Sequence, residues 1–332
     1  MPKPKKSKLI VGLPTRHEEA TIYNALKSIS EAIFYTQIQD YRLVVCINGC
    51  SDKTPKIVND FIKDFPHINC TVIESQPGLV NAQRKIVELF PAEVHVFPDA
   101  DGRIKKDAIK LLLDELNKDK KLMVVYAKTV SLIDKDGRLP LVRKMGILYD
   151  SQKMLTPRRY FHGRLFAVKK WYLPPDTEVL KRAQANKNSR ELLKYCKKQP
   201  LLSADDILMS SYFIDKYGFA SIKQVSRAHC YAWPIGSFVD WLNVYRRRNI
   251  EVEKIKRWYP EYNYLWPLID RYTDWRKWRQ ADFFDKMLWL LYLLMKGIFF
   301  CYLQIEFLLL KLGFYEPPEQ WKTTISTKKR FN

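Results

Sequence analysis

The first 130 residues alternate short apolar runs with segments in which apolar side chains recur every three or four positions. This alternation limits the possible fold more than any other feature, because short apolar runs suit buried strands and the longer spacing suits helices. The strand-like runs are 8–14, 42–47, 68–75, 93–97 and 121–130, and the helix-like segments are 22–33, 57–62, 79–90 and 105–118. The pattern predicts an α/β fold: a mostly parallel sheet flanked by helices and joined by right-handed crossovers.

A polar turn follows each of the first four strand-like runs. The turns are PTRHEEA at 14–20, NGCSDKT at 48–54, SQPGLVNAQR at 75–84 and PDADGR at 98–103. In a sheet of this kind, ligands bind outside the carboxyl ends of the strands. The sequence therefore predicts a binding site at one edge of the sheet.

Two carboxylates one residue apart, Asp99 and Asp101, close the fourth of these runs. Residues i and i+2 of an extended segment point the same way, so the pair can bind one divalent cation. Mg²⁺ and Mn²⁺ prefer such oxygen ligands and complete their shell with phosphate oxygens and water. Asp-Ala-Asp-Gly also suits a simple turn, so the pair by itself leaves both interpretations open.

Charge and cysteine content narrow the class of protein. The net charge of +21 favours an anionic partner, whether nucleic acid, an anionic membrane or a phosphorylated substrate. The six cysteines form no C-x-x-C pair, which favours the reduced thiols of a cytosolic protein. The basic residues 1–8 precede an apolar run that is too short for a signal peptide.

The second half is less regular between residues 131 and 203. We expect the Lys-rich stretch 174–200 to be a mobile loop or an exposed helix, because prolines mark both of its ends. The spacing of apolar residues predicts helices over 201–219 and 238–258.

Four blocks resemble the inverting family 2 nucleotide-sugar glycosyltransferases. In order they are LPTRHEEATI, VCINGCSDKT, FPDADGRI and ADDILMSSYF, and the match in order and spacing covers about residues 8–230. The resemblance implies a Rossmann-like GT-A catalytic domain over 1–230. The remainder, 231–332, is then a helical region that is first basic and aromatic and then apolar.

The resemblance implies a role for each matched residue. Asp99 and Asp101 match the metal and diphosphate motif, and Asp206, beside Asp205, matches the general base. The nucleotide-binding loops supply Pro14, Thr15, Glu18, Asn48 and Asp52, and the segment lining the sugar supplies Gly163 and Arg164. An N-capping role for the adjacent acids Asp205 and Asp206 stays open.

For several further candidate site residues, a purely structural role is an alternative to a role in binding. His229 matches a third metal ligand in some relatives, but it also suits a buried histidine. Arg84 and the run Arg246, Arg247 and Arg248 are candidates for the diphosphate or the acceptor, or for a solvated helix face. His17 and Ile47 depart from the usual Asn and Asp of the family, which leaves the nucleotide open.

We therefore expect a metal-dependent glycosyltransferase, hexosyltransferase-like and inverting. It would use Mn²⁺ or Mg²⁺ and a UDP- or GDP-sugar, with a glycan or lipid-linked acceptor. A basic nucleic-acid-binding protein is the first rival interpretation, because residues 241–279 hold five tryptophans among basic side chains. No nucleic-acid motif is visible, so we expect no nucleic-acid partner. A sugar nucleotidyltransferase is the second rival, and a catalytically inactive relative of the family is the third.

The segment 283–314 is nearly all apolar, with a mostly single polar stripe. Its longest uninterrupted apolar run is 287–295. This run is shorter than the about 20 residues that a helix needs to span a bilayer. We expect one or two helices lying in the interface of an anionic membrane, with Trp289, Tyr292 and Tyr302 at headgroup level. The protein would then be peripheral, on the cytoplasmic face. Packing on the catalytic domain or against a second copy is the alternative.

Overall fold

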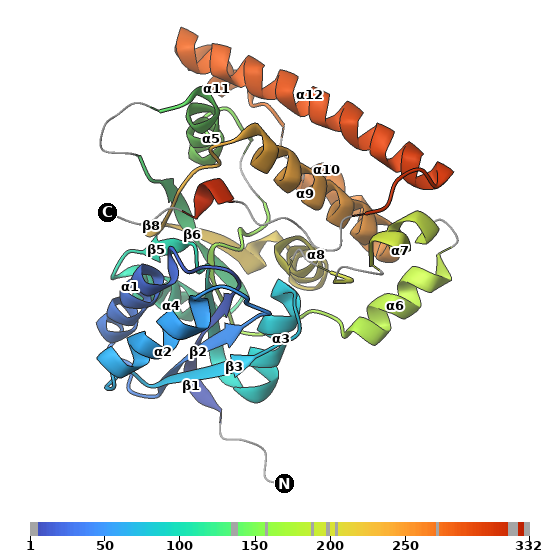
Figure 1. The fold of residues 1–332 in the computed structure, drawn as a ribbon. Coiled ribbons are helices and arrows are strands. Elements are labelled where there is room, and N and C mark those ends of the chain that lie inside the picture. The colour runs from blue at the N-terminus through green and yellow to red at the C-terminus, as the bar shows by residue number, and fades with distance from the viewer. Residues whose placement is uncertain are drawn as a thin grey trace.

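The computed structural model describes residues 6–133, 139–156, 159–186, 189–196, 200–202, 205–269, 272–317 and 325–328. One mixed sheet has the strand order β3-β2-β1-β4-β7-β6-β8-β5. Figure 1 shows helices on both of its faces. The strands are β1 (Ser7–Thr15), β2 (Tyr41–Ile47), β3 (Cys70–Glu74), β4 (Ala92–Pro98), β5 (Gly102–Ile104), β6 (Val124–Ser131), β7 (Leu165–Val168) and β8 (Ile222–Ala232).

The helices follow the apolar periodicity of the sequence. They are α1 (Ile22–Tyr35), α2 (Thr54–Asp64), α3 (Leu79–Leu89), α4 (Ala108–Lys118), α5 (Leu141–Ser151), α6 (Asp176–Ala185), α7 (Arg190–Cys196), α8 (Asp205–Tyr217), α9 (Phe238–Trp258), α10 (Trp266–Ile269), α11 (Trp275–Gln280) and α12 (Phe283–Leu312). Short 3₁₀ turns cover Phe219–Ser221, Pro260–Leu265 and Ile325–Thr327. The predicted helix 238–258 matches α9 at both ends.

Alternation along the strands divides the core into two layers. In β1, Val11 and Leu13 face the cluster that contains Ile29 of α1, whereas Ile10 faces the cluster that contains Ile86 of α3. The strands β3, β2, β1 and β4 run parallel, as their joining helices require. The expected GT-A architecture, a mostly parallel sheet with helices on both faces, is confirmed, and the carboxyl ends of β1, β2 and β4 lie at one edge.

Three strands, β5, β7 and β8, were not predicted from the sequence. β7 pairs antiparallel with both β4 and β6, and β5 pairs antiparallel with β8. The expected domain boundary at residue 230 falls inside β8, which ends at Ala232. Within 174–200, the described residues form α6 and α7, and Val179, Ala183 and Leu192 are buried in the core. The described part of this stretch therefore follows the helix alternative of the prediction, with one face buried.

A layer of helices covers one side of the region that contains the sheet. The apolar segment forms one long helix, α12, which crosses the top of the view in Figure 1 and contacts α5, α9 and α7. By length and composition α12 is the described helix that meets the requirements for crossing a membrane, and 28% of its most apolar window is buried.

Candidate active site

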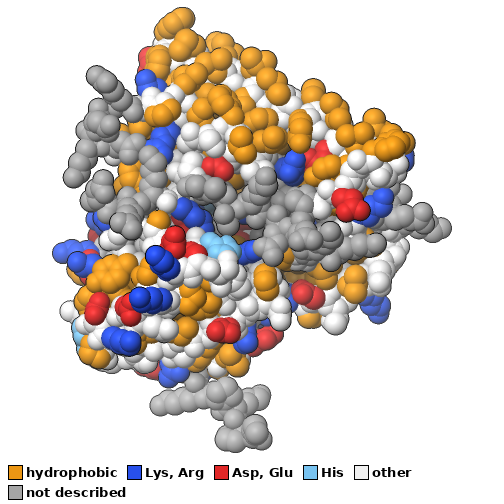
Figure 2. Space-filling model, viewed as in Figure 1, with side chains coloured by type: hydrophobic (Ala, Val, Ile, Leu, Met, Phe, Trp, Pro, Cys, Tyr) orange, Lys and Arg blue, Asp and Glu red, His pale blue; other side chains and the backbone are white. Residues whose placement is uncertain are grey.

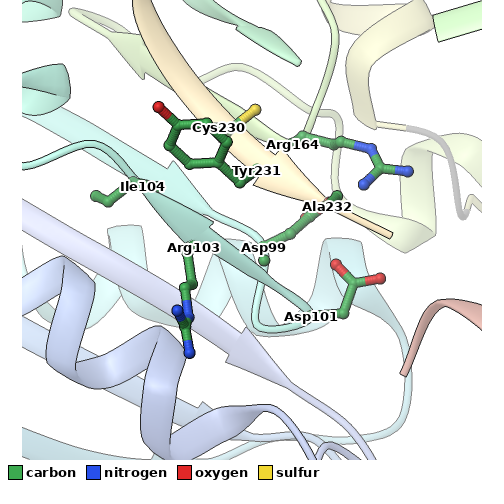
Figure 3. Close-up of a pocket in the computed structure, with 9 residues that line it drawn as sticks. Asp99, Asp101, Arg103, Ile104, Arg164, Cys230, Tyr231 and Ala232 are labelled. Carbon is green, nitrogen blue, oxygen red and sulfur yellow. The ribbon is translucent and has the colours of Figure 1, made fainter. Parts of the chain in front are cut away.

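The acidic pair lies in the turn between β4 and β5. The Asp99 N–H donates to the Arg164 carbonyl at 2.8 Å, which fixes the beginning of the turn next to β7. Asp99, Asp101 and Arg164 line a pocket together with residues of β5 and β8 (Figure 3). The antiparallel pairing of β5 with β8 thus builds the pocket around the two carboxylates.

Negative charge accumulates in this pocket. Burial raises the pKa of Asp99 well above its ordinary value, and Asp101 raises it further. The more distant carboxylates of Asp205 and Glu18 act in the same direction, whereas Arg164 lowers the pKa. Arg164 and Lys328 face these four acids, so negative charge remains in excess and the pocket favours a further cation.

Arg164 supplies positive charge at the same place. Its guanidinium and the Asp101 carboxylate point into the same space in Figure 3. Burial lowers the pKa of Arg164, but the acids led by Asp101 outweigh burial and raise it, so the group stays charged. Its Nη1 atom is buried without a hydrogen-bond partner among the described residues. A buried, unsatisfied guanidinium N–H suits an anion such as a phosphate.

The first loop brings Glu18 within the electrostatic influence of the acidic pair. Thr54 Oγ1 accepts from the Glu18 N–H, and Thr21 Oγ1 donates to the carboxylate, both at 2.8 Å. Burial raises the pKa of Glu18 to about 7, and Asp101 contributes to the rise while Lys328 opposes it. Glu18 therefore shares the electrostatic environment of the acidic pair.

The other predicted loop residues hold the two loops together. Pro14 and Thr15 end β1, and the Thr15 carbonyl accepts from the Asn48 N–H at 3.0 Å. The Asn48 side-chain oxygen accepts from the Gly78 N–H at 2.8 Å, so it already has a structural partner. Gly78 has a φ of 133°, which favours glycine there.

Asp52 ties the second loop to the first. Its Oδ2 accepts from the Glu19 N–H at 3.2 Å and from Thr54 Oγ1 at 2.9 Å. Burial pushes the pKa of Asp52 upward, but these hydrogen bonds outweigh burial and lower it. Asp52 therefore stays ionised, and it positions the loop beside Glu18.

The second acidic pair begins α8. Asp205 is buried and accepts from Gln83 Nε2 of α3 at 2.6 Å, whereas Asp206 is half-buried. A Cβ on Gly163 would lie 3.5 Å from Asp205 Oδ1 and 3.9 Å from Asp206 Cβ, so the predicted sugar-lining segment borders both acids. Burial raises the pKa of Asp205 to about 7, and Asp206 raises it as well.

We predict that Asp205→Asn stabilises the protein more at pH 8 than at pH 5. The native state holds the Asp205 proton up to about pH 7, whereas the unfolded chain releases it near 3.8. Because the native state binds more protons in this window, stability falls as the pH rises through it. The amide removes this charge and keeps an oxygen for Gln83. Each kcal/mol of relieved repulsion should raise the unfolding midpoint by about 2–4 °C.

Thermal unfolding at both pH values measures the effect. Asp205→Ala is the control, because it removes the charge but leaves Gln83 Nε2 without its acceptor. An equal gain at pH 5 and pH 8 from the Asn variant would contradict the assignment.

The three consecutive arginines of α9 point in different directions. Arg248 donates to Tyr149 Oη at 3.1 Å and to Tyr160 Oη at 2.9 Å. These tyrosines and Asp206 raise the pKa of Arg248, which places its charge near the predicted base. Arg246 instead pairs with Glu306 of α12 at 2.8 Å, and Arg247 is exposed. The structure therefore brings Arg248 to the site and leaves Arg247 outside it.

Two other candidates also lie elsewhere. Arg84 donates to the Pro174 carbonyl at 2.9 Å and to Asp176 at 3.1 Å, so it joins α3 to α6. The His229 ring lies 3.0 Å from the Ser226 carbonyl, and the His229 carbonyl accepts from the Lys105 N–H. Because β5 separates Lys105 from the acidic turn, the structure does not bring His229 to Asp99 and Asp101. We remove both residues from the candidate site.

The comparisons with known proteins agree with this geometry. The family model described as "Glycosyl transferase family 2" matches residues 10–171, which include the first loop, the acidic pair and Arg164. This match covers just under half of the chain. The match supports a transferase and favours it over a nucleic-acid-binding protein.

Similar curated proteins match this chain over a small part of their own length. The chain is 27% identical over 154 residues to a chondroitin synthase of Escherichia coli, which covers 46% of this chain and 22% of that protein. It is 25% identical over 152 residues to a hyaluronan synthase of Pasteurella multocida, covering 45% of this chain and 15% of that protein. The chain thus spans less than a quarter of the length of these relatives.

A solved structure shares the fold of this chain. It is a mannosyltransferase from Pyrobaculum calidifontis in complex with GDP-Man and Mn²⁺. The TM-score is 0.51 and the identity 18%, over 76% of this chain and 65% of that chain. At this identity the likeness concerns the arrangement of the elements.

The carboxylates of the acidic turn fit a hard divalent cation that also has other ligands. Asp99 and Asp101 offer oxygen atoms, which Mg²⁺ and Mn²⁺ prefer. Within the described ranges, no three His, Cys, Asp or Glu side chains form a closed metal set. A metal held here would therefore need oxygens from elsewhere, and the unsatisfied Arg164 N–H beside it suits the same anion.

The sequence did not indicate several residues that hold predicted site residues in place by hydrogen bonds. Gln83 fixes Asp205, Thr54 fixes both Glu18 and Asp52, and Tyr149 and Tyr160 fix Arg248. It also missed the segment 326–328, which lies over the acidic pocket. No pattern in the sequence marks these residues, because each contact joins segments far apart in the chain.

Proposed function

We propose that the glycosyltransferase moves a sugar from a nucleoside-diphosphate sugar to an acceptor hydroxyl, with inversion and with help from Mn²⁺ or Mg²⁺. The observation that carries this proposal is that two acidic pairs from distant segments form one electrostatic cluster. Asp205 raises the pKa of Asp99, and Asp206 acts on Arg248. These acids and arginines act on one another electrostatically, which supports a single site with acids for a metal, acids for a proton and arginines for a diphosphate.

The residues divide the reaction between them. Asp206 would accept the proton of the acceptor hydroxyl while its oxygen attacks the anomeric carbon. The bond from this carbon to the diphosphate oxygen breaks, and its electron pair leaves on the diphosphate. Arg164 would stabilise the charge that develops there. A divalent cation bound to Asp99 and Asp101 would supply further Lewis-acid stabilisation of the leaving diphosphate.

The nucleotide and the sugar are best found by direct assay. The full chain with Mn²⁺ or Mg²⁺ is incubated with a panel of UDP- and GDP-sugars, and release of the nucleoside diphosphate is measured. We expect metal-dependent release from at least one donor and inversion at the anomeric carbon of any transferred sugar. If no donor binds or reacts with metal present, the proposal is wrong. The relatives named chondroitin and hyaluronan synthase favour a glycan acceptor.

The orientation of α12 supports attachment to a membrane. One face of this helix packs on the catalytic region through Leu288, Met295, Phe299, Leu303 and Leu310. The opposite face exposes Leu290, Leu294, Ile298, Ile305, Leu308 and Leu312. Orange side chains accordingly line the edge of Figure 2 over α12. At 1.5 Å per residue, this 30-residue helix presents an apolar ridge about 45 Å long.

The partners of α12 favour lying in the interface over crossing the bilayer. Glu306, which departs from the polar stripe of the sequence, faces the protein and pairs with Arg246. Trp289 and Tyr292 stack on each other at 4.8 Å and Trp289 is buried, so the headgroup role predicted for Trp289 fails. Tyr302 remains exposed, and so do Lys296 and Lys311. An apolar ridge flanked by lysines suits an anionic bilayer, where a lipid-linked acceptor would also be within reach.

We predict that the full chain sediments with anionic liposomes and not with neutral ones. The double variant Leu294→Glu/Ile298→Glu should lose at least about tenfold in binding, because two charges replace apolar side chains that would enter the interface. Leu89→Glu/Leu180→Glu, at exposed positions of α3 and α6, is the charge-matched control. Unchanged binding of the first variant would contradict the proposal. Loss of a dimer in that variant, without liposome binding by the parent, would assign the ridge to a second copy.

A further inference from the structure

A short segment from the far end of the sequence lies over the acidic pocket. It comprises the 3₁₀ turn Ile325–Thr327 and Lys328, drawn in red beside β8 in Figure 1. Thr327 is buried, and its Oγ1 donates to Asp101 Oδ2 at 3.3 Å. The segment thus contacts one of the two carboxylates that would bind the metal.

Lys328 occupies the first nucleotide-binding loop. Its Nζ donates to Glu18 Oε1 at 2.6 Å and to the carbonyls of Arg16 and His17 at 3.0 and 2.8 Å. These three acceptors use all three N–H bonds of the ammonium group. The ammonium therefore has a complete set of partners in the loop that the family resemblance assigns to the nucleotide.

Helix α9 and the residues just before it hold this segment in place. The Ser326 N–H donates to Asp240 Oδ2 at 2.9 Å, and Ser326 Oγ accepts from the Gly236 N–H at 2.9 Å. A Cβ on Gly236 would lie 3.3 Å from Ser326 Cβ and 2.8 Å from Arg143 Nε, so a larger residue at position 236 would clash with these side chains. Backbone and side chain of Ser326 are both held, which places Thr327 and Lys328 over the acids.

We propose that residues 326–328 are a built-in competitor of the metal–nucleotide complex. This inference rests on the proposed function, because the competition concerns the donor site. The ammonium of Lys328 is the resident cation of the acidic cluster, and Thr327 holds a carboxylate oxygen that the metal needs. A divalent cation at Asp101 would repel Lys328, and a nucleotide in the first loop would need its place. Donor binding therefore requires the segment to leave.

A role of Lys328 in binding the donor would predict the opposite change in donor affinity. If Lys328 bound the diphosphate directly, its removal would weaken donor binding, since an ammonium group attracts phosphate. If the segment is a competitor, its removal strengthens donor binding. The sign of the change therefore separates the two roles.

The test compares the parent chain with Thr327→Val/Lys328→Met. Binding of Mn²⁺ alone is followed by electron paramagnetic resonance, and binding of UDP and GDP with Mn²⁺ by calorimetry. We expect both affinities to increase, by about tenfold for the nucleotide, because a charge-assisted hydrogen bond no longer holds the closed form. Lys118→Met, at an exposed lysine of α4, is the charge-matched control and should leave both affinities unchanged.

A second measurement uses the unaltered protein. Hydrogen exchange at the Ser326 N–H, which donates to Asp240, should accelerate when Mn²⁺ and the nucleotide are added together. Unchanged or weaker nucleotide binding in the variant, or unchanged exchange in a parent chain that binds nucleotide, overturns the inference and leaves the proposed function intact. If neither protein binds a nucleoside diphosphate with metal, the proposed function fails and the inference fails with it.

Discussion

Asp101→Ala should abolish metal-dependent binding of the donor. Asp101 is one of two carboxylates in the pocket, and the loss of residues that merely support metal ligands already costs about 10–100-fold in affinity or activity. We therefore expect a loss of roughly 100-fold or more for the ligand itself. Calorimetry with Mn²⁺ and the preferred nucleotide measures this loss.

The same substitution should not harm the fold. Asp101 raises the pKa of both Asp99 and Glu18, so its removal relieves repulsion among buried acids. Without metal, the unfolding midpoint of Asp101→Ala should equal or exceed that of the parent chain. Asp114→Ala, at an exposed residue of α4, is the matched control. Full turnover of the parent chain in excess chelator would refute the metal site.

Asp206→Asn should slow transfer and spare donor binding. The amide keeps the shape of the side chain and its hydrogen bonding but cannot accept the proton of the acceptor hydroxyl. General-base catalysis contributes about 10²–10⁴-fold, and the rate should fall within that range. Single-turnover transfer at saturating donor measures the chemical step, and calorimetry measures donor affinity.

The control for Asp206→Asn lies on the same helix. Asp215 is at the far end of α8, where it accepts from Tyr264 Oη at 2.6 Å, and Asp215→Asn should leave the transfer rate unchanged. If Asp206→Asn instead lost donor affinity while the residual rate stayed normal, Asp206 would be a structural residue at the start of α8.

The local pattern of apolar residues was sufficient to predict those strands and helices that show a clear hydrophobic periodicity. The alternation predicted β1, β2, β3, β4 and β6 and the helices between them, because burial of one helical face or of a whole short strand leaves a signature within about ten residues. It also placed the acidic pair at a strand end. β7 and β8 gave no such signal, since their pairing is decided by hydrogen bonds to strands far away in the chain.

The sequence by itself determined which residue types could carry out the chemistry, and the tertiary structure decided which of them meet. Consecutive residues on a helix point about 100° apart, so nothing local shows which of Arg246, Arg247 and Arg248 faces Asp206. Packing of α12 on α9 settles it: Glu306 takes Arg246, and Arg248 turns to the site. Lys328 likewise reaches Glu18 across 310 positions of sequence, a contact created by the fold and absent from every local pattern.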